Sequence, residues 1–349
     1  MEARATRRVG SLAGHLVSPK ELASPEKSAW HTTPCDDGDS LASGALVLHP
    51  DVAAALASGT AVVALESTIV SHGMPYPANL QMAREVEAIV KARGAVPATI
   101  AIMDGVCMVG LGDADLERLA VMGTDALKVS RRDIAVCVAT QKTGATTVSA
   151  TALLAARAGI KVFVTGGIGG VHRGGENSLD VSADLTELSK TPIAVISAGA
   201  KSVLDIPRTL EFLETQGVCV VGYGVTEFPA FFTRRSGCDA PCVVNTPAEA
   251  ARVIKATVQL NLGGCVFGVP IPKEHEAVGG TVQAAIVKAL RELTKQKIIG
   301  RHVTPFLLKR VRELSGGASL TANLALVKNN AKVGADIAVA LAELARDDE

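Results

Sequence analysis

The chain has 349 residues, and its 35 lysine and arginine residues balance 35 aspartate and glutamate residues, so the formal net charge is zero. This neutrality argues against attraction to nucleic acid or to a membrane surface, and the 3% share of aromatic residues argues against base-stacking sites for single-stranded nucleic acid. The 48% hydrophobic share, carried mostly by small and aliphatic residues, is typical of an α/β protein that acts on small molecules.

Residues 1–44 differ in composition from the rest of the chain, because Ser, Pro, Asp and Gly cluster there together with the only Trp. We expect this extension to be poorly ordered. Within it, Arg8-Val9, five further residues and His15-Leu16 resemble the amino-terminal peroxisomal targeting signal, an address that a receptor reads. No apolar run reaches membrane-spanning length without a charge or turn signal, and no secretory segment follows the basic start. We therefore expect a peroxisome or a related organelle, and otherwise the cytoplasm.

From about Leu46 onward, strand-like and helix-like segments alternate. Short β-branched runs that end in Gly, Ser or Thr predict strands at residues 61–65, 99–103, 161–165, 193–197 and 218–221. Helical patterns occupy residues 80–93, 149–158 and 208–215, a capping box at 246–249 opens a helix to about residue 260, Thr304-Pro305 opens another, and a long helix begins near Ser319. This alternation predicts one α/β domain over residues 45–349.

Glu66 is the only charged residue between Asp51 and Arg84, and it follows an apolar run. A carboxylate there is costly unless it is paired or kept protonated, which makes it a candidate general acid. Alternatively, it caps a turn or pairs with a distant arginine at a strand end.

Lys201 follows an equally apolar run, and no other charge lies beside it. Desolvation favours the neutral amine, which is a nucleophile able to form a Schiff base with a sugar aldehyde. The alternative is a lysine that extends from a strand end to solvent.

The glycine-rich residues 165–174 follow a predicted strand and allow the backbone to approach an anionic ligand closely. They lack the third glycine of a dinucleotide fingerprint and the Lys-Ser/Thr ending of a P-loop, so a phosphate or ribose site and a plain turn both remain open. Asp180, Ser182 and Asp184 then supply hard oxygen ligands suited to Mg²⁺ or Mn²⁺. Their structural alternative is a helix start, with Ser182 as its N-cap.

Two further features carry weaker signals. The cationic cluster at residues 128–133 either binds phosphate or forms a solvated face, and residues 142–148 place hydroxyls and amides at a helix entry.

The seven cysteines are scattered through apolar stretches, which favours buried reduced thiols over a disulfide framework. Cys238 and Cys242 form a single pair without a second pair at zinc-site spacing, so structural zinc is not expected.

Five ordered segments together resemble the pseudouridine-5′-phosphate glycosidase family, which is indigoidine synthase A-like. They are ALESTIVSHGMP at 64–75, GATTV at 144–148, VTGGIGGVHRG at 164–174, SAGAKS at 197–202 and TPFLL at 304–308. The resemblance runs from about Val47 to about Leu344 almost without gaps. It implies a single-domain mixed α/β/α-type fold, assembly as a homotrimer and one bound Mn²⁺ per subunit, with Mg²⁺ as the substitute.

The resemblance also implies an activity: reversible cleavage of the carbon–carbon bond of pseudouridine 5′-phosphate to uracil and ribose 5-phosphate, in pseudouridine catabolism, with neither nucleic acid nor membrane as a partner. It assigns Lys201 as the covalent nucleophile, Glu66 as the proton donor and Asp180 as the metal ligand. The residues implied to line the substrate site are Lys128, Val148, Ser182, Ala183 and Asp184, with His172 and Asn323 assisting.

The chemistry explains why these residue types are needed. Uracil is joined to ribose through carbon, so the two-carboxylate scheme of ordinary glycosidases suits it poorly. A lysine that captures C1′ while the ribose ring opens provides an iminium as electron sink, and a carboxylic acid delivers the protons. Two alternatives stay open on the residues: a Schiff-base lyase or aldolase that acts on another phosphosugar, and a non-catalytic phosphosugar-binding protein.

Overall fold

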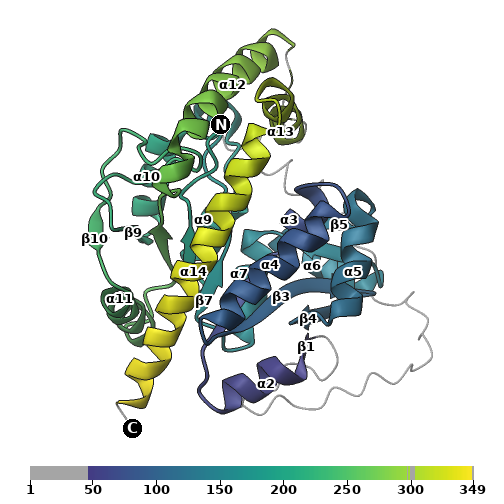
Figure 1. Ribbon diagram of the computed structural model, residues 1–349, viewed down its shortest axis with the longest axis vertical. Coiled ribbons are helices and arrows are strands. Elements are labelled where there is room, and N and C mark those ends of the chain that lie inside the picture. The colour runs from purple at the N-terminus through teal and green to yellow at the C-terminus, as the bar shows by residue number, and fades with distance from the viewer. Residues whose placement is uncertain (1–45, 297, 299–302, 348–349) are drawn as a thin grey trace, which may run out of the picture. The chain divides into compact units, whose positions relative to one another are not determined.

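Strand-forming runs between short helices build one mixed sheet at the centre of the fold. A computed structural model of the chain describes residues 46–296, 298 and 303–347, which belong to one compact unit, Leu41–Glu349 (Figure 1). The strands are β1 (Leu46–Leu48), β2 (Val62–Leu65), β3 (Val96–Met103), β4 (Val106–Val109), β5 (Leu127–Val129), β6 (Gly144–Thr146), β7 (Val162–Val164), β8 (Ala194–Ser197), β9 (Cys219–Tyr223), β10 (Cys242–Val244) and β11 (Cys265–Gly268).

The sheet order is β1-β4-β3-β2-β7-β8-β11-β9-β10, with β6 pairing to β3 and β5 to β6. Every pairing is parallel except those of β3 with β4 and with β6. The strands β2, β7 and β8 are therefore parallel neighbours, and their carboxyl ends share one edge of the sheet. The central strands are buried on both faces, as the unbroken apolar runs predict.

Helices cover the sheet. They are α2 (Pro50–Ala57), α3 (Thr68–His72), α4 (Ala78–Ala92), α5 (Asp113–Met122), α6 (Ile134–Ala139), α7 (Val148–Arg157), α8 (Gly175–Ser178), α9 (Ala183–Leu188), α10 (Ile206–Thr215), α11 (Pro247–Gln259), α12 (Glu276–Lys295), α13 (Val303–Leu314) and α14 (Ala318–Arg346). Short 3₁₀ turns occupy Gly123–Asp125, Arg131–Asp133 and Lys273–His275.

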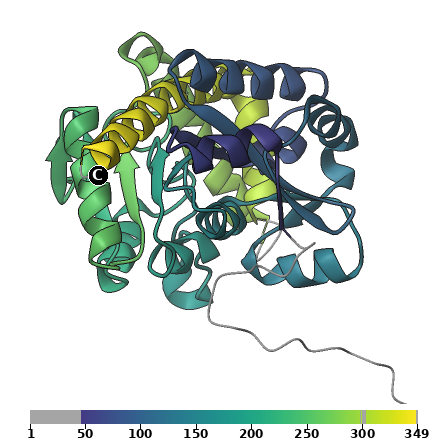
Figure 2. The ribbon, with the colours of Figure 1, turned by 90° about the horizontal axis from the view of Figure 1, so that it is seen from below.

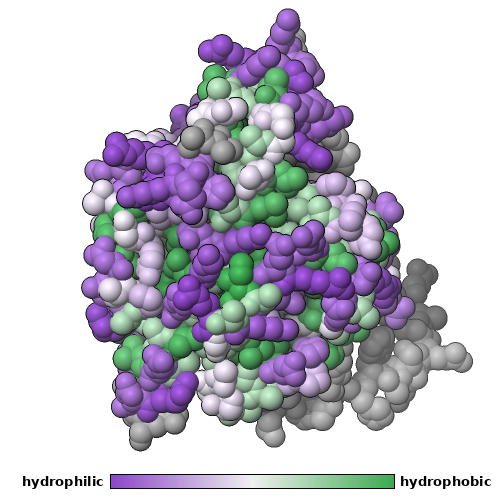
Figure 3. Space-filling model, in the orientation of Figure 1, coloured by the Kyte–Doolittle hydropathy of each residue, from purple (hydrophilic) through white to green (hydrophobic). Residues whose placement is uncertain are grey.

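The long helix α14 packs along β7, β2 and β8 and lies between α4 and α11, and Figures 1 and 2 both show it beside α4. Its buried residues, which include Leu326, Ala331 and Ala335, recur at helical spacing, so one face is turned to the sheet. Hydrophilic residues are interspersed with hydrophobic ones over the side shown in Figure 3. None of the helices in the described ranges has the length and hydropathy needed to cross a bilayer.

The predicted fold class is confirmed, and the predicted strands and helices lie within three residues of their observed bounds. The capping box opens α11 as predicted, because the Thr246 hydroxyl accepts from the Glu249 N–H at 3.2 Å while the Glu249 carboxylate accepts from the Thr246 N–H at 3.2 Å. The six described cysteines are free, but Cys242 is exposed, so the prediction of buried thiols is wrong for that residue. Residues 1–44, with the predicted targeting signal, lie outside the described residues.

Candidate active site

Glu66 lies at the carboxyl end of β2 and is almost fully buried, with 9% of its surface exposed. Thr68, at the start of α3, donates a hydrogen bond to one of its carboxylate oxygens, and Thr165, which follows β7, donates to the other. Two hydroxyl donors thus hold the carboxylate in one orientation. No arginine pairs with it among the described residues, so the alternative of a distant arginine partner is not what is observed.

The chain next to Glu66 is fixed by a buried hydroxyl network. The Ser67 hydroxyl donates to the Ile100 carbonyl at 2.6 Å and accepts from the Thr146 N–H at 2.9 Å. The Thr146 hydroxyl donates to the same Ile100 carbonyl at 2.6 Å. This network ties the ends of β2 and β6 to the middle of β3, so the carboxylate rests on a rigid base.

Lys201 lies just beyond β8, on the same edge of the sheet as Glu66. Its N–H donates to the Ile168 carbonyl at 3.0 Å, which joins it to the glycine-rich turn after β7. The side chain is half-buried. Within the described part of the chain, no ion pair within 4.0 Å joins Lys201 to Glu66.

Lys128, on β5, brings a second amine to this edge. Burial lowers the pKa of Lys128 and the positive charge of Lys201 lowers it further, while the carboxylates of Glu66 and Asp184 act in the opposite direction. Part of the Lys128 side chain nevertheless stays open to solvent. The four predicted residues Glu66, Lys128, Asp184 and Lys201 therefore share one electrostatic environment.

Asp184 is buried and braces two segments of the site. One carboxylate oxygen accepts from the Ser149 N–H at 3.0 Å, in the first turn of α7, and the other accepts from the Gly169 N–H at 2.8 Å. Ser182 caps α9, because its hydroxyl accepts from the Asp184 N–H at 3.3 Å. Ser182 is thus the N-cap that the structural alternative predicts. Asp184 in addition fixes the glycine-rich turn against the start of α7.

The other predicted lining residues differ in burial. Val148 begins α7 with 2% of its surface exposed, so its backbone rather than its side chain can reach a ligand. Ala183 is exposed at the start of α9. In the cationic cluster, Arg131 is engaged by Glu187, with 2.7 Å between its Nη1 and each carboxylate oxygen. Lys128 is the member of that cluster that shares the electrostatic environment of Glu66 and Lys201.

Asp180 lies on the loop between β7 and α9, and 40% of its side chain is exposed. The Nδ1 atom of His172 lies 3.9 Å from its carboxylate, and the His172 N–H donates to the Asp180 carbonyl at 3.0 Å. Within the described ranges, no group of three or more His, Cys, Asp or Glu side chains is placed to hold a metal. In this part of the chain Asp180 thus offers a single carboxylate oxygen ligand, which is too few for a closed protein cage around a cation.

Helix α14 delivers two amides to the site. Asn330 donates to the Thr165 carbonyl at 2.9 Å and to the Gly166 carbonyl at 3.3 Å. Two turns earlier, the Oδ1 atom of Asn323 is buried beside Gly166 and has no hydrogen-bond partner among the described residues. An acceptor left unpaired at this position suits a donor on a ligand.

Sequence reasoning did not single out His72, Thr165 or Asn330. His72 ends α3, and burial lowers its pKa, with a further contribution from the Lys128 charge and an opposing one from the Ala126 backbone. Thr165 and Asn330 act through partners 99 and 165 residues away in sequence. The one local signal that could have indicated Thr165 as a partner of Glu66 is its position directly after an apolar strand.

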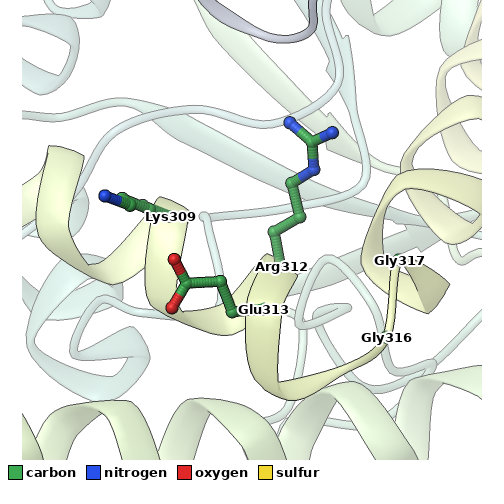
Figure 4. A pocket seen from close by; sticks show the side chains of 5 residues that line it. All are labelled: Lys309, Arg312, Glu313, Gly316 and Gly317. Carbon is green, nitrogen blue, oxygen red and sulfur yellow. The ribbon is translucent and has the colours of Figure 1, made fainter.

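Two cavities lie apart from these residues. One cavity of about 500 Å³ is lined by residues of α13 and of the turn before α14, which are Lys309, Arg312, Glu313, Gly316 and Gly317 (Figure 4). A groove of about 440 Å³ runs along α4 beside Tyr76 and Arg84. Neither cavity is lined by a predicted site residue. The candidate active site is therefore defined by the side chains at the carboxyl edge of the sheet.

Comparison with known proteins gives a consistent result. Residues 51–340 match the family model described as indigoidine synthase A like protein. A relative from Arabidopsis thaliana named pseudouridine-5′-phosphate glycosidase is 58% identical over 315 residues, covering 90% of this chain and 95% of the relative. The solved structure of the prealnumycin C-glycosynthase AlnA in complex with ribulose 5-phosphate is 39% identical, with a TM-score of 0.80, and covers 86% of this chain and 98% of its own. An indigoidine synthase A-like protein from Thermotoga maritima is 36% identical, with a TM-score of 0.76, and covers 85% and 96%.

Proposed function

The chain belongs to the family of indigoidine synthase A-like proteins and is an enzyme, and from this premise we propose that it reversibly cleaves pseudouridine 5′-phosphate to uracil and ribose 5-phosphate. The family predicted from the sequence motifs is confirmed by these matches. The relatives that carry this activity in their names are 52–58% identical over more than four fifths of the chain, which supports the proposal.

The observation that carries the proposal is the placement of Glu66 and Lys201. They follow β2 and β8, which flank β7 in the sheet, so one small ligand at this edge can lie between them. Parallel sheets bind ligands at the carboxyl ends of their strands. Lys128 shares the electrostatic environment of both residues, so a ligand between them also meets a second amine.

In the proposed mechanism, the neutral amine of Lys201 attacks C1′ of the ribose. The C1′–N bond forms, the bond from C1′ to the ring oxygen breaks, that oxygen takes up a proton, and the nitrogen loses one, which restores its lone pair. The nitrogen lone pair then forms the C=N bond of an iminium while the bond from C1′ to uracil C5 breaks, and C5 takes up a proton. Water hydrolyses the iminium, which frees ribose 5-phosphate and Lys201.

Glu66 is proposed to deliver these protons. Its carboxyl group is buried and held by Thr68 and Thr165, so its orientation is fixed before a substrate binds. A general acid acts only when it lies within hydrogen-bond reach of the atom that accepts the proton. Rigid support from the Ser67 and Thr146 network keeps the carboxyl group in that position.

Asp180 is proposed to hold a divalent cation, with Mn²⁺ as the first choice and Mg²⁺ as the substitute. When bound, the ion would neutralise phosphate charge and order water near it. Lys128, the backbone of Val148, and the segment of Ser182, Ala183 and Asp184 are proposed to line the substrate site. The unpaired Oδ1 atom of Asn323 is proposed to accept a hydrogen bond from the substrate, and His172 to orient Asp180.

The test combines turnover with trapping. The protein is incubated with pseudouridine 5′-phosphate and uracil is quantified, and in parallel ribose 5-phosphate is reduced onto the protein with borohydride for mass spectrometry. We expect uracil release and an adduct on Lys201. Lys201→Ala should lose both, and Glu66→Gln should keep ribose 5-phosphate binding while slowing cleavage. Turnover by Lys201→Ala comparable to that of the wild type would overturn the proposal.

A second candidate is a Schiff-base lyase or aldolase that acts on another phosphosugar. The structure of AlnA, which holds ribulose 5-phosphate, favours keeping it, because a relative of this fold binds a ketose phosphate. Turnover of a ketose phosphate without release of uracil from pseudouridine 5′-phosphate would select this alternative. A protein that binds ribose 5-phosphate but forms no adduct and turns over neither compound would be a non-catalytic binding protein.

Three finer points are also proposals. We propose that the chain assembles as a homotrimer, which the molar mass in solution tests. The catabolic direction is tested by whether cells that lack the protein accumulate pseudouridine 5′-phosphate. Location in a peroxisome or related organelle is tested by imaging full-length fusions with and without the Arg8-Val9 and His15-Leu16 pairs.

A further inference from the structure

The loop between β9 and β10 crosses the segment that carries Lys201. The Phe231 N–H donates to the Ala198 carbonyl at 2.8 Å, and Ala230 and Gly199 form an isolated antiparallel bridge. On its other side the same segment bonds to the glycine-rich turn, because the Ile168 N–H donates to the Gly199 carbonyl at 3.1 Å. The backbone of residues 198–201 is therefore held from both sides.

Phe231 has an unusual backbone conformation. Its φ is 63°, in the left-handed region that a bulky non-glycine residue rarely adopts. Such a conformation costs free energy and persists only where the surrounding structure imposes it, which is most often at functional sites. The ring is nonetheless well buried, with 7% of the residue exposed.

The Phe231 ring reaches over the lysine segment to the glycine-rich turn. A β-carbon at Gly167 would lie 2.5 Å from Cδ2 of the ring and 2.9 Å from the Gly199 carbonyl oxygen. Only a glycine leaves room for the ring here. Phe231 thus bonds to the lysine segment through its backbone and packs through its ring on the turn that begins with Thr165, the partner of Glu66.

We propose that Phe231 is a positioning residue, which fixes the Lys201 segment against the glycine-rich turn so that the amine reaches the anomeric carbon in line with the Glu66 acid. This inference rests on the proposed function. Small displacements of a nucleophile cost rate, and Phe231 is not among the residues proposed to line the substrate site. Loss of the ring should therefore slow adduct formation while leaving ribose 5-phosphate binding nearly unchanged.

Phe232 provides a matched control. It is buried to the same extent, with 8% exposed, and its ring packs edge-on against Phe231 with 4.6 Å between centroids. Its φ is not in the left-handed region, and its ring is not among the atoms that close on Gly167. A change to leucine removes one buried ring of this loop at either position, but the ring atoms nearest the Gly167 β-carbon belong to Phe231.

The experiment measures the rate of borohydride-trapped adduct against ribose 5-phosphate concentration for the wild type, Phe231→Leu and Phe232→Leu. We expect Phe231→Leu to lower the saturating rate about 10- to 100-fold, with a half-saturating concentration within about threefold of the wild type. Phe232→Leu should change both values by less than about threefold.

Each outcome decides the matter. Equal saturating rates for the two variants, or a loss confined to the half-saturating concentration, would overturn the positioning role while leaving the lysine chemistry in place. A wild-type protein without adduct would instead overturn the proposed function, and this inference with it. If Phe231→Leu does not fold, Phe231→Met keeps most of the volume, and a wild-type saturating rate in that folded variant would count against the ring.

Discussion

Thr165 donates a hydrogen bond to Glu66 although the two residues are 99 positions apart in the sequence. The contact exists because β2 and β7 are parallel neighbours and both residues directly follow their strands. Its consequence is that the proposed acid is oriented by the strand that lies between it and Lys201. A substitution that removes this hydrogen bond therefore tests how much the orientation of Glu66 matters.

Thr165→Val keeps the volume and removes the hydroxyl, so one oxygen of a buried carboxyl group loses its donor. We expect turnover to fall about tenfold and the free energy of unfolding to fall by about 1–3 kcal/mol. Uracil release and urea denaturation measure the two effects. Thr165→Ser keeps the hydroxyl and should retain most of the activity; a valine variant as active as the serine variant would show that the hydroxyl is dispensable.

Asp184→Asn tests the brace between α7 and the glycine-rich turn. The carboxylate accepts from the N–H groups of Ser149 and Gly169, whereas an amide offers one oxygen and turns an N–H toward the second donor. We expect a loss of about 2–3 kcal/mol in the free energy of unfolding, because a buried N–H is left unpaired. Urea denaturation monitored by circular dichroism provides the value, and a loss below about 0.5 kcal/mol would contradict the bracing role.

Asp180→Asn should behave in the opposite way. The side chain is 40% exposed and its contact with His172 is long, so the free energy of unfolding should change by less than about 0.5 kcal/mol. If Asp180 holds the divalent cation, the variant should need at least tenfold more Mn²⁺ for half-maximal turnover. Metal titration after chelation measures this, and an unchanged requirement would remove Asp180 from the metal site.

His72 predicts a pH dependence of stability. Burial and then the Lys128 charge lower its pKa in the folded state below the ordinary value of 6.5. Below pH 6.5 the unfolded chain therefore binds a proton that the folded chain resists, so the stabilising contribution is complete above pH 6.5 and is lost as the pH falls through the lowered pKa. The advantage of the wild type over His72→Asn in urea denaturation should stay nearly constant from pH 7.5 to about pH 6.5 and shrink from there to pH 5. Parallel curves over that range would contradict the assignment.

The sequence predicted the proposed reactive side chains better than their supports. Glu66 and Lys201 are isolated charges after apolar runs, and that local pattern locates strand ends correctly. The contacts that orient them depend on which strands become neighbours, which no local pattern encodes. The edge strands β1 and β10 have three residues each and α3 has five, so their periodicity is too short to detect.

The long helix α14 links the fold to the site, and Gly334 sets how closely it approaches β7. A β-carbon at Gly334 would lie 2.2 Å from Cγ2 of Val164, so Gly334→Ala must push the helix away from the strand. One turn earlier Asn330 bonds to the Thr165 carbonyl, so the shift should reach the site. We expect a loss of about 1–3 kcal/mol in the free energy of unfolding together with reduced turnover.

Gly280 in α12 is the matched control for this change, since no atom lies within 4 Å of the β-carbon that alanine would add there. The substitution at that position replaces a flexible residue inside a helix without a clash, so Gly280→Ala should stabilise the protein by up to about 1 kcal/mol. The same chemical change is thus expected to have opposite signs at two helical positions, because only one of them faces a strand at van der Waals distance. Urea denaturation of both variants decides the matter, and a Gly334→Ala protein as stable as Gly280→Ala would show that α14 can move without cost.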